Sequence, residues 1–63
     1  MHQEEYKGHT ITVDTMRRSK GWSWNYQIDG DSIRSGGDRP LRNEELARKE
    51  AIGAAKRAID GMA

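Results

Sequence analysis

The clearest pattern in the chain is a strict alternation of large apolar and polar residues that starts at Trp22 and ends at Asp29. The apolar positions are Trp22, Trp24, Tyr26 and Ile28. Because successive side chains of a strand point to opposite faces, this period of two predicts a strand over about 21–29 with one apolar face. A weaker alternation in a β-branched stretch predicts a preceding strand over about 8–16. The polar segment 17–21, which ends in glycine, then forms the hairpin loop between the two strands.

A second turn follows at Asp29-Gly30-Asp31-Ser32, and two registers are open for it. With Gly30 and Asp31 at its centre, Ile28 lies opposite Ile33, whereas with Asp29 and Gly30 at its centre, Ile28 lies opposite Asp31. The first register is preferred because it pairs two apolar residues. It predicts a short edge strand over 32–35 with Ile33 inward and Arg34 outward, followed by a flexible connector over 36–42.

A helix is predicted over about 44–61. Asn43 is a suitable N-cap, and Glu44 and Glu45 lie in the first turn, where carboxylates meet the positive end of the helix dipole. Glu44 with Arg48 and Glu45 with Lys49 have the favourable i, i+4 order, and Gly61 suits the helix end. At 100° per residue, one apolar arc collects Ala47, Ala51, Ile52, Ala54, Ala55, Ala58, Ile59 and Met62.

These elements predict one α+β domain over 1–63, in which a three-stranded antiparallel β-meander carries one C-terminal α-helix on one face (β-β-β-α, two layers). Small residues on the helix complement large ones on the strands. The expected core collects residues from both layers: Ile11, Val13, Trp22, Trp24, Tyr26, Ile28, Ile52, Ala55 and Ile59. Residues 1–7 contain no apolar run and are expected to be disordered.

The amino-acid composition excludes several classes of function for this chain. The chain has 63 residues, of which 33% are apolar, so it has a thin core and no room for a large enclosed active site. With no cysteine, disulfides, zinc knuckles and thiol catalysis are excluded, and no segment approaches the roughly 20 apolar residues of a membrane span. A cytoplasmic location without membrane association is therefore expected.

No catalytic, cofactor-binding or metal-binding residues are predicted, and no cofactor or small-molecule substrate is inferred. His2 and His9 lack the spacing of a metal site, and no serine lies in a G-x-S-x-G elbow. The chain is therefore expected not to be an enzyme.

A basic cluster is the only candidate binding site that the sequence offers. It consists of Arg17, Arg18 and Lys20 in the hairpin loop, with Arg34, Arg39 and Arg42 from the third strand and the connector. Together they could contact nucleic-acid phosphates. A net charge of only +1, two carboxylates on the same sheet face (Asp14 and Asp29) and aromatic rings committed to the helix side weigh against this function.

The strand Thr10-Ile11-Thr12-Val13 would form an edge of the predicted sheet. It contains no Lys, Pro or evident bulge to discourage pairing with another strand, so a homodimer is possible. The preferred expectation is a non-enzymatic interaction module that binds a protein partner or itself. Weak nucleic-acid binding through the basic cluster is the alternative.

The strings Gly21-Trp22-Ser23-Trp24 and Ala54-Ala55-Lys56-Arg57-Ala58-Ile59, within this layout, resemble small uncharacterised β-β-β-α proteins of bacteria, for which the resemblance implies no known activity. The layout is also similar to the three-stranded DNA-binding domains of phage-type integrases and to the sheet-plus-helix part of HicB-like antitoxins. Integrase-like domains carry basic and polar groups on the exposed sheet face, where this chain has two Asp. HicB-like domains have a further strand and helix. No diagnostic residue of either family is matched, so no binding residue carries over.

Overall fold

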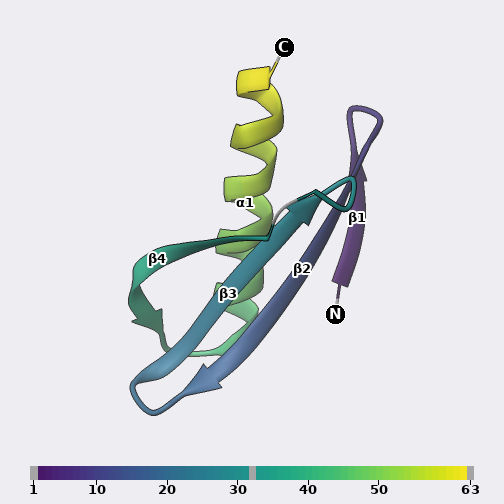
Figure 1. The fold of residues 1–63 in the computed structure, drawn as a ribbon. Coiled ribbons are helices and arrows are strands. Elements are labelled where there is room, and N and C mark those ends of the chain that lie inside the picture. Colours follow the sequence, from purple (N-terminus) through teal and green to yellow (C-terminus); the bar gives the residue numbers. More distant parts are fainter. Residues whose placement is uncertain (1, 32, 63) are drawn as a thin grey trace.

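The chain folds into a four-stranded antiparallel sheet and one helix (Figure 1). A computed structural model describes residues 2–31 and 33–62, without the side chains of 36–39 and 62. The strands lie in the order β1-β2-β3-β4. In chain order, the elements are β1 His2–Tyr6, β2 His9–Arg18, β3 Gly21–Ile28, β4 Arg34–Leu41 and α1 Glu44–Met62.

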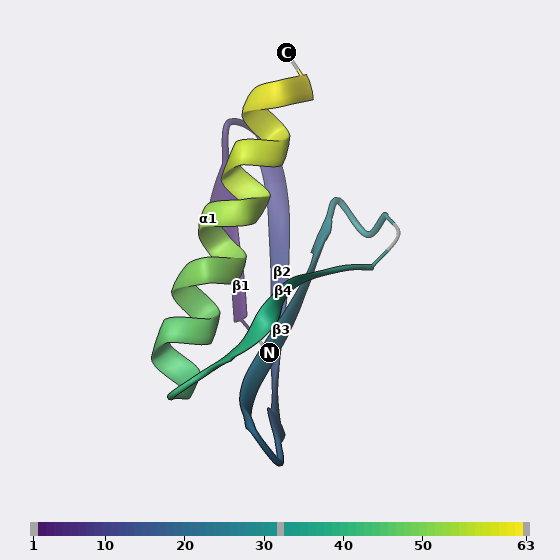
Figure 2. The same cartoon turned by 90° about the vertical axis from the view of Figure 1, so that its left-hand side faces the viewer.

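The predicted α+β class is confirmed, with α1 packed on one face of an antiparallel sheet (Figure 2). β2 and β3 form the central hairpin, in which Val13 lies opposite Tyr26. Residues directly opposite each other share a face, so the apolar positions of both strands point toward the helix. The helix begins after Asn43, whose Oδ1 accepts a hydrogen bond from the Leu46 amide at 2.8 Å, as the N-cap interpretation predicts.

The core lies between α1 and the central hairpin. Ala47, Ala51 and Ala55 are fully buried and recur every fourth residue, and Ile59 continues the same stripe. Methyl side chains allow the helix axis to approach the sheet closely, and the large residues of the strands fill the remaining space. The predicted core is largely confirmed: Ile11, Val13, Trp24, Tyr26 and Ile28 are buried, whereas Trp22 and Ile52 are partly buried at its margin.

The expectation that residues 1–7 are disordered is wrong for residues 2–7. Residues 2–6 form β1, which pairs with β2 through a tight turn at Lys7 and Gly8, both with positive φ. The side chains that hold β1 against α1 are polar and charged. The Tyr6 hydroxyl donates to Asp60 at 3.1 Å, and the ammonium groups of Lys7 and Lys56 lie 2.7 Å and 3.1 Å from carboxylate oxygens of Asp60 and Glu4. An apolar pattern therefore could not reveal this strand.

The preferred β3–β4 turn is also wrong. Asp29 and Gly30 have φ values of 54° and 77°, and the Asp31 amide donates to the Ile28 carbonyl oxygen at 3.0 Å. The turn is therefore centred on Asp29 and Gly30, residue types that tolerate positive φ at both central positions. Ile33 is 64% exposed and is not the inward partner of Ile28.

The sequence predicts the third strand over 32–35 and a connector over 36–42, and the structure differs in both. β4 instead spans 34–41 and takes in most of that connector, while Ser32 lies outside the described residues. The pairing shifts between Trp24↔Gly36 and Trp22↔Leu41, so β4 carries a bulge. The two glycines and Pro40 of this segment are tolerated because β4 is an edge strand.

The described helix is not apolar enough along its length to cross a membrane.

Candidate functional site

The basic residues gather at the end of the sheet that holds the β2–β3 loop. Arg17 pairs with Trp22, and Trp22 pairs with Leu41 on its other side. The end of β2, the start of β3 and the end of β4 therefore lie at the same end of the sheet. Arg42 follows Leu41 directly and therefore lies at the same end of the sheet as the cations of the loop. We define the basic hairpin end as Arg17, Arg18, Lys20 and Arg42, which are all exposed.

The strands approach each other closely at this end because of Gly21. A Cβ atom at this position would lie 2.7 Å from the Leu41 carbonyl oxygen and 2.8 Å from Pro40 Cβ. The φ of Gly21 is 142°, which also disfavours any other residue. The absence of a side chain at Gly21 therefore leaves room for Pro40 and Leu41, which precede Arg42.

The cations of the basic hairpin end lie on both faces of the sheet. Arg17 is opposite Trp22 and shares the helix-side face, whereas Arg18 lies on the outer face, where its Nε donates to Ser23 Oγ at 3.2 Å. Among the described residues, no carboxylate lies within ion-pair distance of these cations. Their charge is therefore directed to solvent.

The structure does not bring all six predicted contact residues together. Arg34 pairs with Tyr26 at the opposite end of β4 and shares the helix-side face, so the outward orientation predicted for it is wrong. The side chain of Arg39 lies outside the described residues.

The outer sheet face is uncovered by the helix and is mostly polar (Figures 1 and 2). By register, its described positions on the three first strands are Gln3, Glu5, Thr10, Thr12, Asp14, Met16, Arg18, Ser23, Asn25 and Gln27.

Asp29, one of the two carboxylates expected to oppose nucleic acid, interacts with β2 at the far end of the sheet. Its oxygens lie 2.6 Å from His9 Nδ1 and 2.9 Å from the Thr10 amide nitrogen. These two hydrogen bonds lower the pKa of the Asp29 carboxyl, the one from His9 more strongly. The carboxylate is therefore held away from the basic hairpin end.

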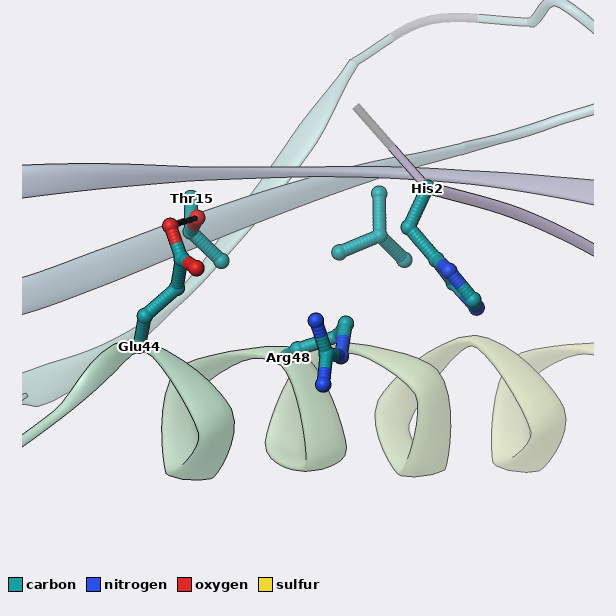
Figure 3. A pocket seen from close by; sticks show the side chains of 5 residues that line it. His2, Thr15, Glu44 and Arg48 are labelled. Atoms are coloured by element: carbon teal, nitrogen blue, oxygen red, sulfur yellow. Dashed lines mark hydrogen bonds between the residues drawn. The ribbon is translucent and has the colours of Figure 1, made fainter.

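A small cavity of about 80 Å³ lies between the sheet and the first half of α1 (Figure 3). His2, Val13 and Thr15 line it from the strands, and Glu44 and Arg48 line it from the helix. The Thr15 hydroxyl donates to Glu44 Oε2 at 3.2 Å. The predicted pair of Glu44 with Arg48 is not formed within ion-pair distance, whereas Glu45 and Lys49 do pair, at 3.7 Å.

The ring of His2, which lines this cavity, contains an unsatisfied polar atom. Its Nε2 is buried and has no hydrogen-bond partner; the nearest carboxylate oxygen, from Glu4, is 3.7 Å away, too far for a hydrogen bond. Sequence reasoning missed the cavity because it placed His2 in a disordered terminus. The sequence offered no alternation as a signal, because His2, Gln3, Glu4 and Glu5 are all polar.

No group of three or more His, Cys, Asp or Glu side chains that could hold a metal ion occurs among the residues described. No protein-family model matches the chain, and no match is found among curated proteins or solved structures.

Proposed function

We propose that this chain is a non-enzymatic interaction module that binds a double-stranded nucleic acid through its phosphates. The observation that carries the proposal is the basic hairpin end, where Arg17, Arg18, Lys20 and Arg42 are exposed at one end of the sheet with no carboxylate in ion-pair distance among the described residues. Phosphate contacts of this kind supply sequence-independent affinity, which grows with the number of phosphates that Lys and Arg side chains neutralise.

A duplex is favoured over a single strand because of where the aromatic rings lie. Proteins that hold single strands stack bases on exposed aromatic side chains. Trp24 and Tyr26 are buried, with their rings stacked 6.0 Å apart, and Trp22 is partly buried at the margin of the core. The cations therefore lack an adjacent stacking platform.

Self-association, which the sequence analysis prefers together with binding to a protein partner, loses its structural argument. It required Thr10–Val13 to form a free sheet edge, but β2 lies between β1 and β3. Gln3 pairs with Thr12 and Glu4 with Ile11, so the backbone of this segment is paired on both sides. A protein partner would therefore need to bind a surface other than the edge of β2.

The test is a titration of labelled 20-base-pair DNA, 20-base-pair RNA and a 20-nucleotide single strand, followed by fluorescence anisotropy at 50–200 mM salt. About four phosphate contacts predict a slope of log affinity against log salt near −4 on duplex DNA. Replacing two of the four cations, as Arg17→Ala with Arg18→Ala, should flatten the slope by about two.

The matched control is Lys49→Ala with Arg57→Ala, which removes the same charge from the exposed side of α1. It should leave the slope nearly unchanged. If both double variants change binding equally, the site is not the basic hairpin end. A duplex Kd weaker than about 100 μM at 150 mM salt, the weak limit of non-specific binding, would contradict the proposal.

A further inference from the structure

The hairpin of β2 and β3 extends beyond the start of the helix. The first residue of α1, Glu44, accepts a hydrogen bond from the Thr15 hydroxyl at 3.2 Å, so the helix begins level with Thr15 and its partner Trp24. We define the hairpin tip as the part of the two strands past this level, residues 16–23. It extends past the first turn of α1 (Figures 1 and 2). At about 3.4 Å per residue, Ser19 in the turn lies roughly 13 Å beyond Thr15.

The two arginines of the hairpin tip lie on its opposite faces. Arg17 is on the helix-side face, whereas Arg18 is on the outer face, where its Nε donates to Ser23 Oγ at 3.2 Å. Because Ser23 lies opposite Met16, this hydrogen bond directs the Arg18 guanidinium back along the sheet, away from the turn. The sequence contains no acidic residue over 15–28. Both faces of the tip therefore present positive charge, set back from the turn.

The dimensions of the hairpin tip match the major groove of B-form DNA. A sheet with its side chains is about 10 Å thick. The major groove is about 12 Å wide and about 8.5 Å deep, whereas the minor groove is only about 6 Å wide. When the tip enters the major groove, its turn reaches the base edges and its two faces lie toward the phosphates of the two DNA strands. Arg17 and Arg18, behind the turn, are then at the mouth of the groove beside those phosphates.

An RNA duplex offers no equivalent groove. The major groove of A-form RNA is deep and too narrow for side chains to read, and its minor groove is wide and shallow. The hairpin tip is too thick for the first groove. In the second groove it contacts the duplex from one side, so the phosphates are reached by only one of its two faces.

We propose that the hairpin tip enters the major groove of B-form DNA with its turn first, and that Arg17 and Arg18 pair with phosphates of opposite strands. The chain therefore prefers DNA duplexes to RNA duplexes. Ser19 and Lys20, which are exposed in the turn, lie nearest the base edges. The inference rests on the proposed function and adds to it the kind of nucleic acid and the groove. Because the arginines contact phosphates, affinity depends on duplex geometry more than on base sequence.

The groove is tested with a nitroxide label in the turn and proton NMR of a short DNA duplex. Because the chain has no cysteine, Ser19→Cys gives a single labelling site. Thymine methyl groups lie in the major groove, whereas adenine C2 protons lie in the minor groove. The labelled turn should broaden the methyl signals more than the C2 proton signals, and reduction of the nitroxide should restore both. A label at Arg57→Cys, on the exposed side of α1, is the control and should broaden neither.

The preference for DNA and the contact on two faces are tested by fluorescence anisotropy. At 150 mM salt, the unmodified chain should bind a DNA duplex about tenfold or more tightly than an RNA duplex of the same length and sequence. Glucosylated 5-hydroxymethylcytosine in the DNA fills the major groove with a sugar and should weaken binding by about tenfold or more. Arg17→Ala and Arg18→Ala should each flatten the salt slope on DNA by about one, whereas Lys49→Ala should leave it nearly unchanged.

Three results overturn major-groove entry while the proposed function stands. They are equal affinity for DNA and RNA duplexes, broadening that is stronger at the C2 protons, and a salt slope that only one of the two arginines changes. Absence of duplex binding by the unmodified chain overturns the proposed function as well. The amide spectrum of each variant reports its folding, so a loss of binding is not confused with unfolding.

Discussion

At the scale of single residues, Gly21 has the strictest requirement among the glycines at positions 8, 21, 30, 53 and 61. Its positive φ and the missing Cβ both allow β4 to cross close to the β2–β3 loop. Gly53, within α1, has no such constraint, since a Cβ there would meet nothing nearer than an Arg57 guanidinium nitrogen at 3.8 Å. The two glycines therefore predict opposite responses to the same substitution.

Gly21→Ala should destabilise the chain by about 2 kcal/mol or more, because of backbone strain and a clash with main-chain atoms that cannot move aside. Gly53→Ala should stabilise it by about 0.5–1 kcal/mol, since alanine loses less conformational entropy in a helix. Urea unfolding followed by tryptophan fluorescence measures both. Equal stability of Gly21→Ala and the unmodified chain would contradict the close approach of β4.

At the scale of elements, the sequence predicted best the parts that are held by apolar packing. β3 and α1 were found because Trp22, Trp24 and the alanines of α1 repeat with the period of their element. β1 was missed because its inward residues are mainly polar and its contacts with α1 come from residues more than fifty positions away, such as Asp60. Those contacts exist only once the fold has formed.

The sequence predicts a third strand that is shorter than β4, for a different reason. Gly36, Gly37 and Pro40 are typical of a loop, and only the pairing of Leu41 with Trp22 reveals that the strand continues past them. The turn before it was misassigned because the choice rested on burying Ile33, which is in fact exposed. The preference of Asp-Gly for positive φ was the stronger signal. For the candidate site, the sequence grouped Arg42 with the loop cations, but it also included Arg34, whose place at the opposite end of β4 depends on this register.

The charged attachment of β1 to α1 should make the stability of this strand depend on acid. Hydrogen bonding and ion pairing to Lys56 lower the pKa of the Glu4 carboxyl below 4.5, and those to Lys7, with Tyr6, lower the pKa of Asp60 below 3.8. A carboxyl whose pKa is lower in the folded state stabilises the fold above its unfolded pKa. This stabilisation is lost as the pH falls from about 4.5 through the lower pKa of the folded state.

Amide hydrogen exchange of β1 measures this effect directly. Protection of the Glu4 and Tyr6 amides, which point toward β2, should fall between pH 5 and pH 3 by more than protection of β3, once corrected for the intrinsic pH dependence of exchange. Glu4→Gln with Asp60→Asn should show low β1 protection already at pH 7 and a weaker further change. Glu50→Gln, an exposed helix position without an ion pair among the described residues, is the control and should behave as the unmodified chain does.

At the scale of the whole molecule, β1 covers an edge that would otherwise pair with other chains. β2 contains Thr10, Ile11, Thr12 and Val13, β-branched residues without a charge or proline to interrupt them. In the intact chain, β1 occupies this edge. The free edge of β1 itself carries Glu4 and Glu5, and like charges would face each other if two copies paired antiparallel there. The edge strand therefore opposes self-association, which the β2 edge would promote.

Deleting residues 2–7 should accordingly convert the protein from a monomer into an associating species. Light scattering across a hundredfold concentration range should give the 7.2 kDa mass for the intact chain at every concentration and a rising mass, at least twice that of the monomer, for the truncated chain. The truncated chain retains β2, β3 and most of the apolar core, so association is expected to proceed by edge pairing, with strand content retained in circular dichroism. Glu4→Gln with Asp60→Asn keeps β1 in the chain but loosens it, and should associate only at the highest concentrations. A truncated chain that stays folded and monomeric would show that the β2 edge is harmless without its cover, and that β1 is present for another reason, such as carrying His2 to the cavity.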